Sequence, residues 1–574
     1  MNYDIIFITP EYYDHPLCGV AILKRVLESE GYKVGIIPSP KNEKDILCLG
    51  KPKLFFGITS GSIDSMLRNY SALNRPREND ENLNFEKTVP DRAVIVYANW
   101  VRKYFKDSKI VLGGTEATLR RFTHYDYWSN SLRKSILFDT RADILVYGNG
   151  EKQVLEIAER IKNKKEISGI KGTCIRTREI PKNFQVNSAR RQNSSGILHK
   201  DKTPAATIGV QLRAENEIDY IPKILPSHEE VLESKEKFCD MQNMFSNQEN
   251  LAQKTGNFYI LQYMFPEYKS EDLDKYYELP FSRKINLKEM KGFEFSVVTH
   301  RGCIGNCNFC SLRLTSGDKI ISRSEDSILR ELKYITSLPN FKGNIDDFGG
   351  PSANMYGMDC PARYVCKNNC LECKKLDRSN KKLIELLKKA RKINFGTPNS
   401  RSEFYRKDFA KQNPIACRNK TNYTPKVKGI KKIFIRSGIR YELANDEYLK
   451  ELKHHISGRL KIAPEHVNSE ILKLMNKSGG NLDEFIRKFR KLDCGDLSFY
   501  FMAAHPGSSM KEAEELKSYM KKIKNAEKIQ IFTPTPMTVS TCMYYTEMNP
   551  RTKKKIYVPK TFSEKKMQKR ILYE

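Results

Sequence analysis

The stretch Phe295-Ser-Val-Val-Thr-His-Arg-Gly-Cys303-Ile-Gly-Asn-Cys307-Asn-Phe-Cys310 joins a β-like run to three cysteines within eight residues. Three thiolates on such a short, glycine-containing loop can converge on one metal centre. Structural zinc sites ordinarily use four ligands, and the next cysteine along the chain is Cys360. Three thiolates on a 4Fe-4S cluster leave one iron without a protein ligand, open to a substrate or cofactor. Because ferredoxins use a different spacing and a fourth cysteine, a plain electron carrier fits poorly.

A regular alternation of β-like and helical segments surrounds this stretch. Six βα-like units predict a partial (β/α)6 barrel, whose working face lies at the carboxyl ends of its strands. The expected strands are residues 295–299, 344–348, 432–437, 459–463, 498–503 and 529–532.

The first part of the chain shows the same alternation. Five β-like runs separated by helical patterns predict an α/β fold with a doubly wound parallel sheet. The expected strands are residues 3–8, 32–38, 54–59, 110–112 and 144–147. Gly61, Gly113-Gly114 and Gly148/Gly150 follow strands, where such folds place ligand-binding turns, although each is also compatible with an ordinary turn.

These patterns predict four regions. Residues 1–165 form a Rossmann-like domain, 166–291 a connecting subdomain, 292–550 the barrel with a Cys-rich insertion at 351–378, and 551–574 a basic C-terminal tail.

The composition limits the class of protein. The 574 residues include 100 Lys and Arg against 69 Asp and Glu, a formal net charge of +31, and 14 Cys. No run approaches the roughly 18 apolar residues of a membrane span, and the N-terminus has no cationic signal-peptide region. We therefore expect a cytoplasmic protein without membrane contact, whose cysteines serve metal binding or catalysis. The charge suggests a nucleic-acid partner, but without a clustered basic motif a Lys-rich surface that serves solubility is the better explanation.

The spacing C-x3-C-x-aromatic-C, with Phe309 as the aromatic residue, resembles the signature of the radical S-adenosylmethionine (SAM) superfamily. Further stretches resemble the YgiQ-type family within it, and the similarity covers nearly the whole chain, stopping short of a C-terminal segment that longer relatives carry. They are Asp4–Leu23, Arg301-Gly302-Cys303, 317–324, Gly349–Tyr356, Ser437–Tyr441, Leu460–His466, Ala504–Gly507 and Phe532–Met537.

The resemblance implies a chemistry. Cys303, Cys307 and Cys310 would hold a 4Fe-4S cluster whose open iron binds SAM. An electron from a donor such as flavodoxin or ferredoxin would cleave SAM, and the resulting 5′-deoxyadenosyl radical would abstract a hydrogen atom from the substrate. The family resemblance supplies no substrate, so we assign no catalytic residue.

The resemblance also places residues around SAM, among them Phe309 of the cysteine signature. Gly349 and Gly350 resemble the glycine motif that lets the backbone approach the methionine amine. Ser437 and Arg440 end the third barrel strand, where polar side chains meet the SAM ribose or carboxylate. We expect Glu465, His466 and His505, at later strand ends, to face the cavity, the histidines mainly as supporting hydrogen-bond partners. His454 and His455 fall within an expected helix and are interpreted as surface residues.

A second group of cysteines lies in the insertion: Cys360, Cys366, Cys370 and Cys373. Four thiolates in fourteen residues can close a zinc site or a second iron–sulfur centre with no open position. We predict a second metal site here, with free reduced thiols as the alternative.

The N-terminal domain is similar to the cobalamin-binding domains of many radical SAM enzymes. Those domains use an Asp-x-His-x-x-Gly motif to bring a histidine to cobalt. Here Asp14-His15-Pro16-Leu17-Cys18-Gly19 has the histidine one position early. We therefore predict no cobalamin with a histidine ligand, and interpret the domain as a degenerate form that binds substrate instead of cobalamin.

Two functions remain open. The first is a radical SAM enzyme acting on an unidentified substrate. The alternative is a basic, metal-containing nucleic-acid-binding protein without catalysis, or a radical SAM enzyme that modifies RNA, although no RNA-binding motif supports either. The oligomeric state is not indicated by the sequence.

Overall fold

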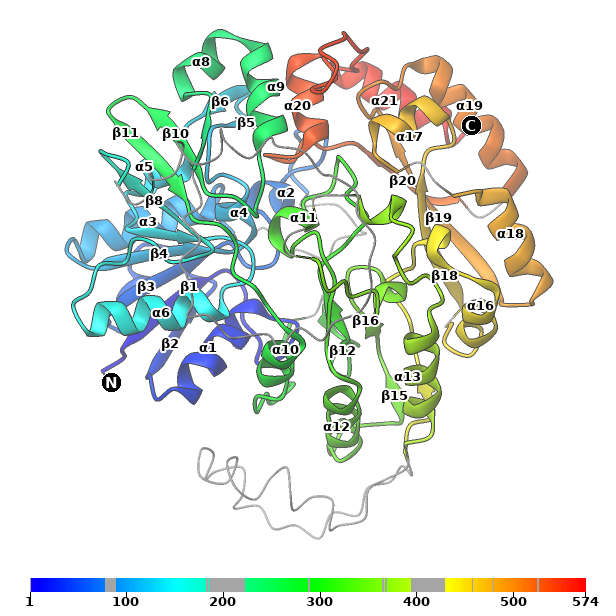
Figure 1. Cartoon of the computed structure of the whole chain (residues 1–574), viewed down its shortest axis with the longest axis horizontal. Helices are drawn as coiled ribbons and strands as arrows, with labels where there is room; N and C mark the ends of the chain where they lie inside the picture. The colour runs from blue at the N-terminus through cyan, green and yellow to red at the C-terminus, as the bar shows by residue number, and fades with distance from the viewer. Residues whose placement is uncertain are drawn as a thin grey trace, which may run out of the picture.

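The computed structural model describes residues 2–77, 89–181, 184, 222–287, 290–363, 366, 369–393, 429–456, 458–477, 480–523 and 526–574. The chain forms two α/β halves that lie side by side, with the N-terminal half in blue through cyan to green and the barrel in green to orange (Figure 1).

The N-terminal half contains the predicted parallel sheet. Its strands run in the order β2-β1-β3-β4-β7, and all neighbours are parallel. They are β1 (Ile5–Thr9), β2 (Val34–Pro38), β3 (Phe55–Thr59), β4 (Lys109–Gly113) and β7 (Ile144–Val146). Every residue of β1 and β3 is buried, as expected for strands covered on both faces. The five-stranded, doubly wound prediction is confirmed.

The same sheet continues into the expected connecting subdomain. Four more strands extend it in the order β8-β11-β10-β9, so that one nine-stranded sheet spans both regions. They are β8 (Thr173–Thr177), β9 (Lys223–Leu225), β10 (Leu251–Thr255) and β11 (Phe258–Gln262). The boundary expected at 165/166 therefore does not separate two sheets.

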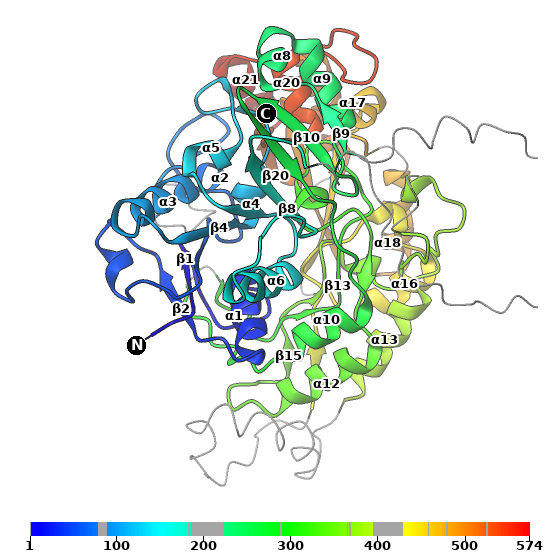
Figure 2. The same ribbon diagram turned by 60° about the vertical axis from the view of Figure 1, so that its left-hand side comes forward.

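Helices cover both faces of the parallel part of this sheet (Figure 2). Helices α1 (Gly19–Ser29) and α6 (Glu151–Lys162) pack together, whereas α3 (Ala93–Tyr104) packs on β3 and α5 (Ile136–Thr140). The remaining elements of this half are α2 (Ser65–Asn69), α4 (Gly114–Thr118), β5 (His124–Asp126), β6 (Ser131–Arg133), α8 (His228–Glu233), α9 (Lys235–Met244) and α10 (Ser270–Tyr277).

The second half is a partial barrel of parallel strands. β12 pairs with β16, β15 with β17, and β18 with β19 and then β20, while a bridge between Ile439 and Ile462 joins the third strand to the fourth. The strands are β12 (Val297–Val298), β15 (Asn344–Ile345), β16 (Phe348–Gly349), β17 (Lys432–Ile433), β18 (Arg459–Glu465), β19 (Asp496–Ala503) and β20 (Ala526–Ile531). The partial barrel predicted from the sequence is confirmed.

Helices pack around the barrel strands. They are α12 (Glu325–Thr336), α13 (Lys381–Arg391), α16 (Asp446–Leu452), α17 (Ser469–Leu474), α18 (Leu482–Lys491) and α19 (Met510–Ile523). The strands β13 (His300–Arg301) and β14 (Ile321–Ser322) form a short antiparallel pair that flanks the cysteine loop and its helix α11 (Leu312–Thr315).

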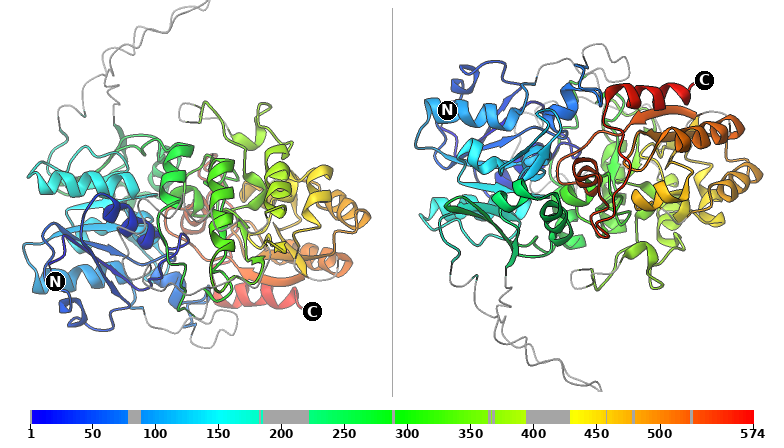
Figure 3. Two further views of the ribbon diagram at one scale, coloured as in Figure 1. Left: turned by 90° about the horizontal axis from the view of Figure 1, so that it is seen from below. Right: turned by 90° about the horizontal axis from the view of Figure 1, so that it is seen from above.

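The C-terminal segment returns to the N-terminal half. Helix α20 (Val539–Thr546) packs on α9, and Phe532, Cys542 and Tyr544 belong to the hydrophobic core of the N-terminal sheet. The expected basic tail contains helix α21 (Phe562–Ile571), drawn in red in Figure 3, which packs on α19 and β20. Lys565 of this helix is buried, with its Nζ atom 2.9 Å from the hydroxyls of Tyr127 and Tyr544. This segment therefore joins the two halves.

No helix among the described residues is both long enough and apolar enough to cross a bilayer.

Candidate functional site

The three cysteines lie on the loop between β13 and α11, at the carboxyl end of the first barrel strand. Cys303, Cys307 and Cys310 are each partly buried. The Cys303 thiol accepts a hydrogen bond from the Gly305 amide at 3.4 Å, and the Cys310 amide donates to the Cys307 carbonyl at 3.1 Å. Burial raises the pKa of Cys303 and of Cys310, the latter to about 12. Metal binding at these thiols would therefore release protons.

This loop is held from two sides. The Asn308 amide donates to the Met475 carbonyl at 2.9 Å, and its side chain donates to the Leu474 carbonyl at 2.8 Å, so the loop is fixed to α17. On the other side the Cys303 amide donates to the Gly317 carbonyl at 3.1 Å. The loop thus has a defined shape that the protein's own hydrogen bonds maintain.

Among the described residues, no three His, Cys, Asp or Glu side chains meet closely enough to bind a single metal ion. A cubane cluster binds each thiolate to a different iron, so its ligands stand farther apart than those of one ion. Three neighbouring thiols on a fixed loop are the donor set that such a cluster needs.

Arg440 lies directly beside the cysteine loop. Its Nη1 atom is 3.3 Å from the Cys307 sulfur, and its Nη2 atom pairs with Glu442. The side chain is 6 % exposed, and the Asn354 side chain fixes its backbone on both sides, donating to the Arg440 carbonyl at 2.8 Å and accepting from its amide at 3.0 Å. A guanidinium paired with Glu442 therefore lies beside one of the three expected cluster ligands.

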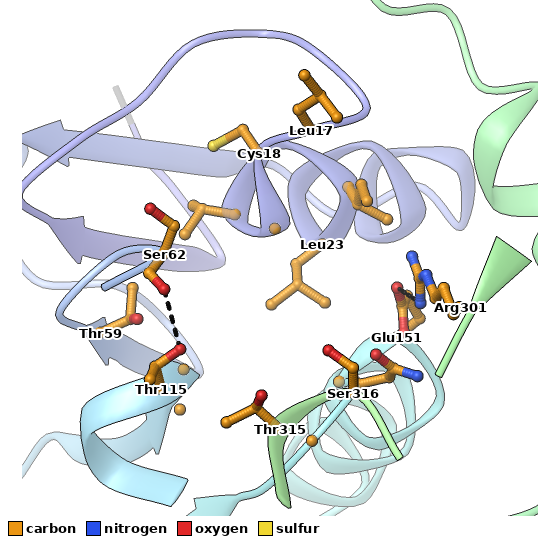
Figure 4. A pocket seen from close by; sticks show the side chains of 18 of the residues that line it. Leu17, Cys18, Leu23, Thr59, Ser62, Thr115, Glu151, Arg301, Thr315 and Ser316 are labelled. Atoms are coloured by element: carbon orange, nitrogen blue, oxygen red, sulfur yellow. Dashed lines mark hydrogen bonds and ion pairs between the residues drawn. The ribbon is translucent and has the colours of Figure 1, made fainter. Parts of the chain in front are cut away.

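A cavity of about 620 Å³ lies between the two halves, beside the cysteine loop. One wall is formed by the carboxyl ends of β1, β3, β4 and β7 with their glycine turns, and the other by β12, β16 and the residues after Cys310 (Figure 4). Its walls are mainly apolar, with polar groups from Thr59, Ser62, Thr115, Thr315 and Ser316. This size and lining are typical of small-molecule and cofactor sites.

Three of the residues expected to contact SAM line this cavity: Gly349, Gly350 and Ser437. Ser437 donates its hydroxyl to Asp347, and the same carboxylate accepts the Ser437 amide at 3.1 Å. A side chain at Gly350 would begin 2.7 Å from the His300 ring, so the glycine is required for close packing there. Arg440 and Phe309 do not line the cavity. Phe309 packs edge-on against His505, with ring centroids 6.4 Å apart.

The cavity wall also offers polar atoms that lack protein partners. In the described part of the chain, Asn149 Nδ2, Ser296 Oγ and His300 Nε2 are buried without a hydrogen-bond partner. Burial lowers the pKa of His300 to about 4, so its ring is neutral near pH 7. Buried polar groups usually have partners, and a ligand in the cavity would supply them.

The residues at the ends of later barrel strands, Glu465, His466 and His505, lie outside the cavity. Glu465 has a left-handed backbone conformation (φ 69°), and its Oε1 atom lies 3.8 Å from Lys477 Nζ. Burial raises the pKa of its carboxyl group. His505 is buried, with its ring nitrogens 2.8 Å from the Pro506 carbonyl and 2.7 Å from the Ser540 hydroxyl. His466 accepts the Asn468 amide at 3.0 Å. None of the three lines the cavity, against our expectation, and both histidines make supporting hydrogen bonds.

The second cysteine group lies near the first. Cys370 and Cys303 pack against one small hydrophobic cluster that includes Ile304 and Met355, and Lys319 Nζ is 3.4 Å from the Cys370 sulfur. Cys360, Cys366 and Cys373 are also partly buried. A metal site at these four residues stays a prediction.

His15 does not face the cavity. Its Nδ1 atom accepts the Leu17 amide at 3.0 Å, and Nε2 lies 3.0 Å from the Glu294 carbonyl. The shifted histidine is therefore a buried structural residue, while its neighbours Cys18 and Gly19 line the cavity.

Sequence relationships agree with this site. Residues 1–294 match the family profile "Radical SAM N-terminal", 297–520 match "Radical SAM superfamily", and 527–573 match a domain of unknown function, DUF3362. The chain is thus a radical SAM protein with an N-terminal α/β domain.

Full-length relatives define the family more narrowly. A UPF0313 protein of Methanocaldococcus jannaschii is 39% identical over 99% of this chain and 89% of its own length. A second, from Fusobacterium nucleatum, is 38% identical over 100% of this chain and 96% of its own length. The chain belongs to the UPF0313 family, which confirms the YgiQ-type resemblance.

A solved structure shares the whole architecture. The radical SAM methyltransferase TsrM from Kitasatospora setae, with cobalamin and a 4Fe-4S cluster bound, superposes with a TM-score of 0.50 at 13% identity, covering 95% of this chain and 76% of that one. A protein with this fold thus binds cobalamin, and our expectation that cobalamin is absent is wrong. That expectation rested on one misplaced histidine, whereas a large cofactor is held by a whole cavity.

Two cavity residues were assigned no function from the sequence, although both belong to stretches that carry the resemblance to known families. Glu151 and Arg301 form an ion pair across the cavity wall, with 2.7 Å between Oε1 and Nη1 (Figure 4). Glu151 follows a strand and a glycine turn, a position typical of ligand-binding loops, but its partner lies far away in the sequence.

Proposed function

We propose that the protein is a radical SAM enzyme with Cys303, Cys307 and Cys310 as ligands of a 4Fe-4S cluster. The observation that carries the proposal is the fixed three-cysteine loop beside a cavity lined by Gly349, Gly350 and Ser437. When bound, the reduced cluster would supply the electron that cleaves SAM to methionine and a 5′-deoxyadenosyl radical, which takes a hydrogen atom from the substrate. A small redox protein such as flavodoxin or ferredoxin would deliver the electron.

The chain's own residues would hold SAM at this position. Gly349 and Gly350 leave room for the methionine amine to reach the backbone, and Arg440 offers a guanidinium for its carboxylate. Ser437, fixed by Asp347, offers a hydroxyl at the cavity edge for the ribose. The apolar walls would keep water away from the radical.

The test is reductive cleavage of SAM by anaerobically reconstituted protein. We expect 5′-deoxyadenosine with dithionite as reductant, and none from Cys307→Ala. Cys494→Ala removes a buried thiol away from the loop and should retain the activity. A wild-type protein with a full cluster that leaves SAM intact would contradict the proposal.

We also propose that the cavity between the halves binds cobalamin. The support is the set of glycine turns of the N-terminal sheet that line it and the partnerless polar atoms of its wall. Gly19 lines the cavity, and a Cβ atom there would meet nothing within 4 Å. We therefore expect Gly19→Phe to block the stoichiometric uptake of hydroxocobalamin, followed by absorbance, while Gly19→Ala permits it. Lack of uptake by the wild type would contradict this proposal.

The family matches and the fold lend no support to the nucleic-acid-binding alternatives. The substrate stays unassigned.

A further inference from the structure

One buried ion pair links the N-terminal domain to the cysteine loop. Glu151 belongs to the first domain, and Arg301 precedes Cys303 by two residues. Their side chains are 4 % and 11 % exposed, and both line the cavity. The pair therefore lies where the ligands of the two halves would meet.

Glu151 is fixed on the N-terminal side. It is the first residue of α6, directly after the turn Gly148-Asn149-Gly150, and no side chain caps this helix. Its carboxylate stands at the positive end of the helix dipole. The hydroxyl of Tyr268, a buried residue, lies 3.4 Å from the second carboxylate oxygen. Movement of the glycine turn around a ligand would thus move this carboxylate.

Arg301 is fixed on the barrel side. Its Nε atom donates to the Tyr277 hydroxyl at 2.9 Å, and its guanidinium lies over the Tyr277 ring, 5.1 Å from the centroid. Between Arg301 and Cys303 there is only Gly302, where a Cβ atom would lie 1.9 Å from the Lys319 carbonyl oxygen. Because this link is short and tightly packed, a displacement of Arg301 reaches Cys303 directly.

A gain in folding stability alone does not explain such a buried ion pair well. Desolvation of two buried charges offsets much of their attraction, and apolar side chains of similar size often seal an interface equally well. A buried pair does, however, fix one relative position of the two elements that carry it. Here those elements are a ligand-binding turn and the loop for the cluster.

We propose that Glu151 and Arg301 are positioning residues that couple the ligand at the N-terminal turn to SAM at the cysteine loop. The inference rests on the proposed function. Since coupling between two sites is reciprocal, occupancy of the N-terminal side changes the affinity for SAM, and the ion pair transmits the change.

The experiment measures equilibrium SAM binding to the full chain loaded with its cluster, with and without saturating hydroxocobalamin. We expect hydroxocobalamin to shift the SAM dissociation constant of the wild type at least about fivefold. In Glu151→Gln the shift should disappear, and Arg301→Lys, which keeps the cation, should retain part of it.

A matched control is the pair of Arg92 and Asp126, which lies in the N-terminal half with 3.1 Å between Nη2 and Oδ2 and a buried carboxylate, outside the cavity. The Asp126→Asn variant should be less stable than the wild type but should keep the shift in the SAM dissociation constant. A shift retained in Glu151→Gln, or absent in a wild type that binds both ligands, contradicts the inference alone. A wild type that binds neither SAM nor hydroxocobalamin contradicts the proposed function, and the inference falls with it.

Discussion

The Nη1 atom of Arg440 lies 3.3 Å from the sulfur of Cys307, which places a buried guanidinium against the expected cluster. Replacement by Met keeps much of the volume and removes the charge. Hydrogen bonds to charged groups contribute about 1.5–3 kcal/mol, so we expect Arg440→Met to weaken SAM binding about 10- to 150-fold. Equilibrium binding to cluster-loaded protein measures the change. Arg436→Met, at an exposed position nearby, is the control, and an unchanged affinity in Arg440→Met would exclude a SAM contact.

Gly302 tests how closely the cysteine loop is packed. Its φ is 84°, and an added Cβ atom would lie 1.9 Å from a backbone oxygen. We expect Gly302→Ala to lower the free energy of unfolding by more than the roughly 1–3 kcal/mol of backbone strain, and to reduce the iron content after reconstitution.

Gly317 provides the comparison for this experiment. Its φ is 92°, but a Cβ atom there would meet nothing within 4 Å, so Gly317→Ala reports the strain without the collision. Urea unfolding separates the two effects, and equal losses in both variants would show that the loop has room to relax.

The predictable parts of this protein are those encoded by local patterns. The fully buried strand Ile5–Thr9 reads as an apolar run because both faces are covered, and the alternation of β-like and helical segments predicts both α/β halves. His455 shows where local patterns fail. Helix α16 ends at Leu452, and His455 turns inward, with its ring nitrogens 2.9 Å from the Ile433 carbonyl and 3.1 Å from Glu451.

Local sequence patterns do not predict the cavity either. It forms where two halves meet, so the pairing of Glu151 with Arg301 depends on tertiary structure. The cobalamin expectation failed for the same reason, since one histidine position says little about a site built from four strand ends.

The cysteines of the insertion lead to a prediction about the metal content of the protein. If Cys360, Cys366, Cys370 and Cys373 bind a metal, anaerobically purified protein should contain more than four irons, or about one zinc, per chain. Replacement of all four by Ser should remove the excess and leave the first cluster intact, as judged by elemental analysis and the reduced-cluster EPR signal. Four irons and no zinc in the wild type would remove the second site.

His505 leads to a prediction of pH dependence. Burial lowers its pKa to about 3, well below the ordinary value near 6.5. Between these values the unfolded chain binds a proton that the folded chain does not. The contribution of His505 to the unfolding free energy is therefore fully present above pH 6.5 and lost progressively as the pH falls toward 3.

We expect the unfolding free energy of the wild type to fall more steeply between pH 6.5 and 4.5 than that of His505→Gln, by about 1.4 kcal/mol per pH unit. Urea titrations at several pH values measure both slopes. The difference in slope reports the proton itself, because simple destabilisation by the substitution shifts the whole curve without tilting it. Parallel curves for wild type and His505→Gln would mean that His505 accepts its proton in the folded protein.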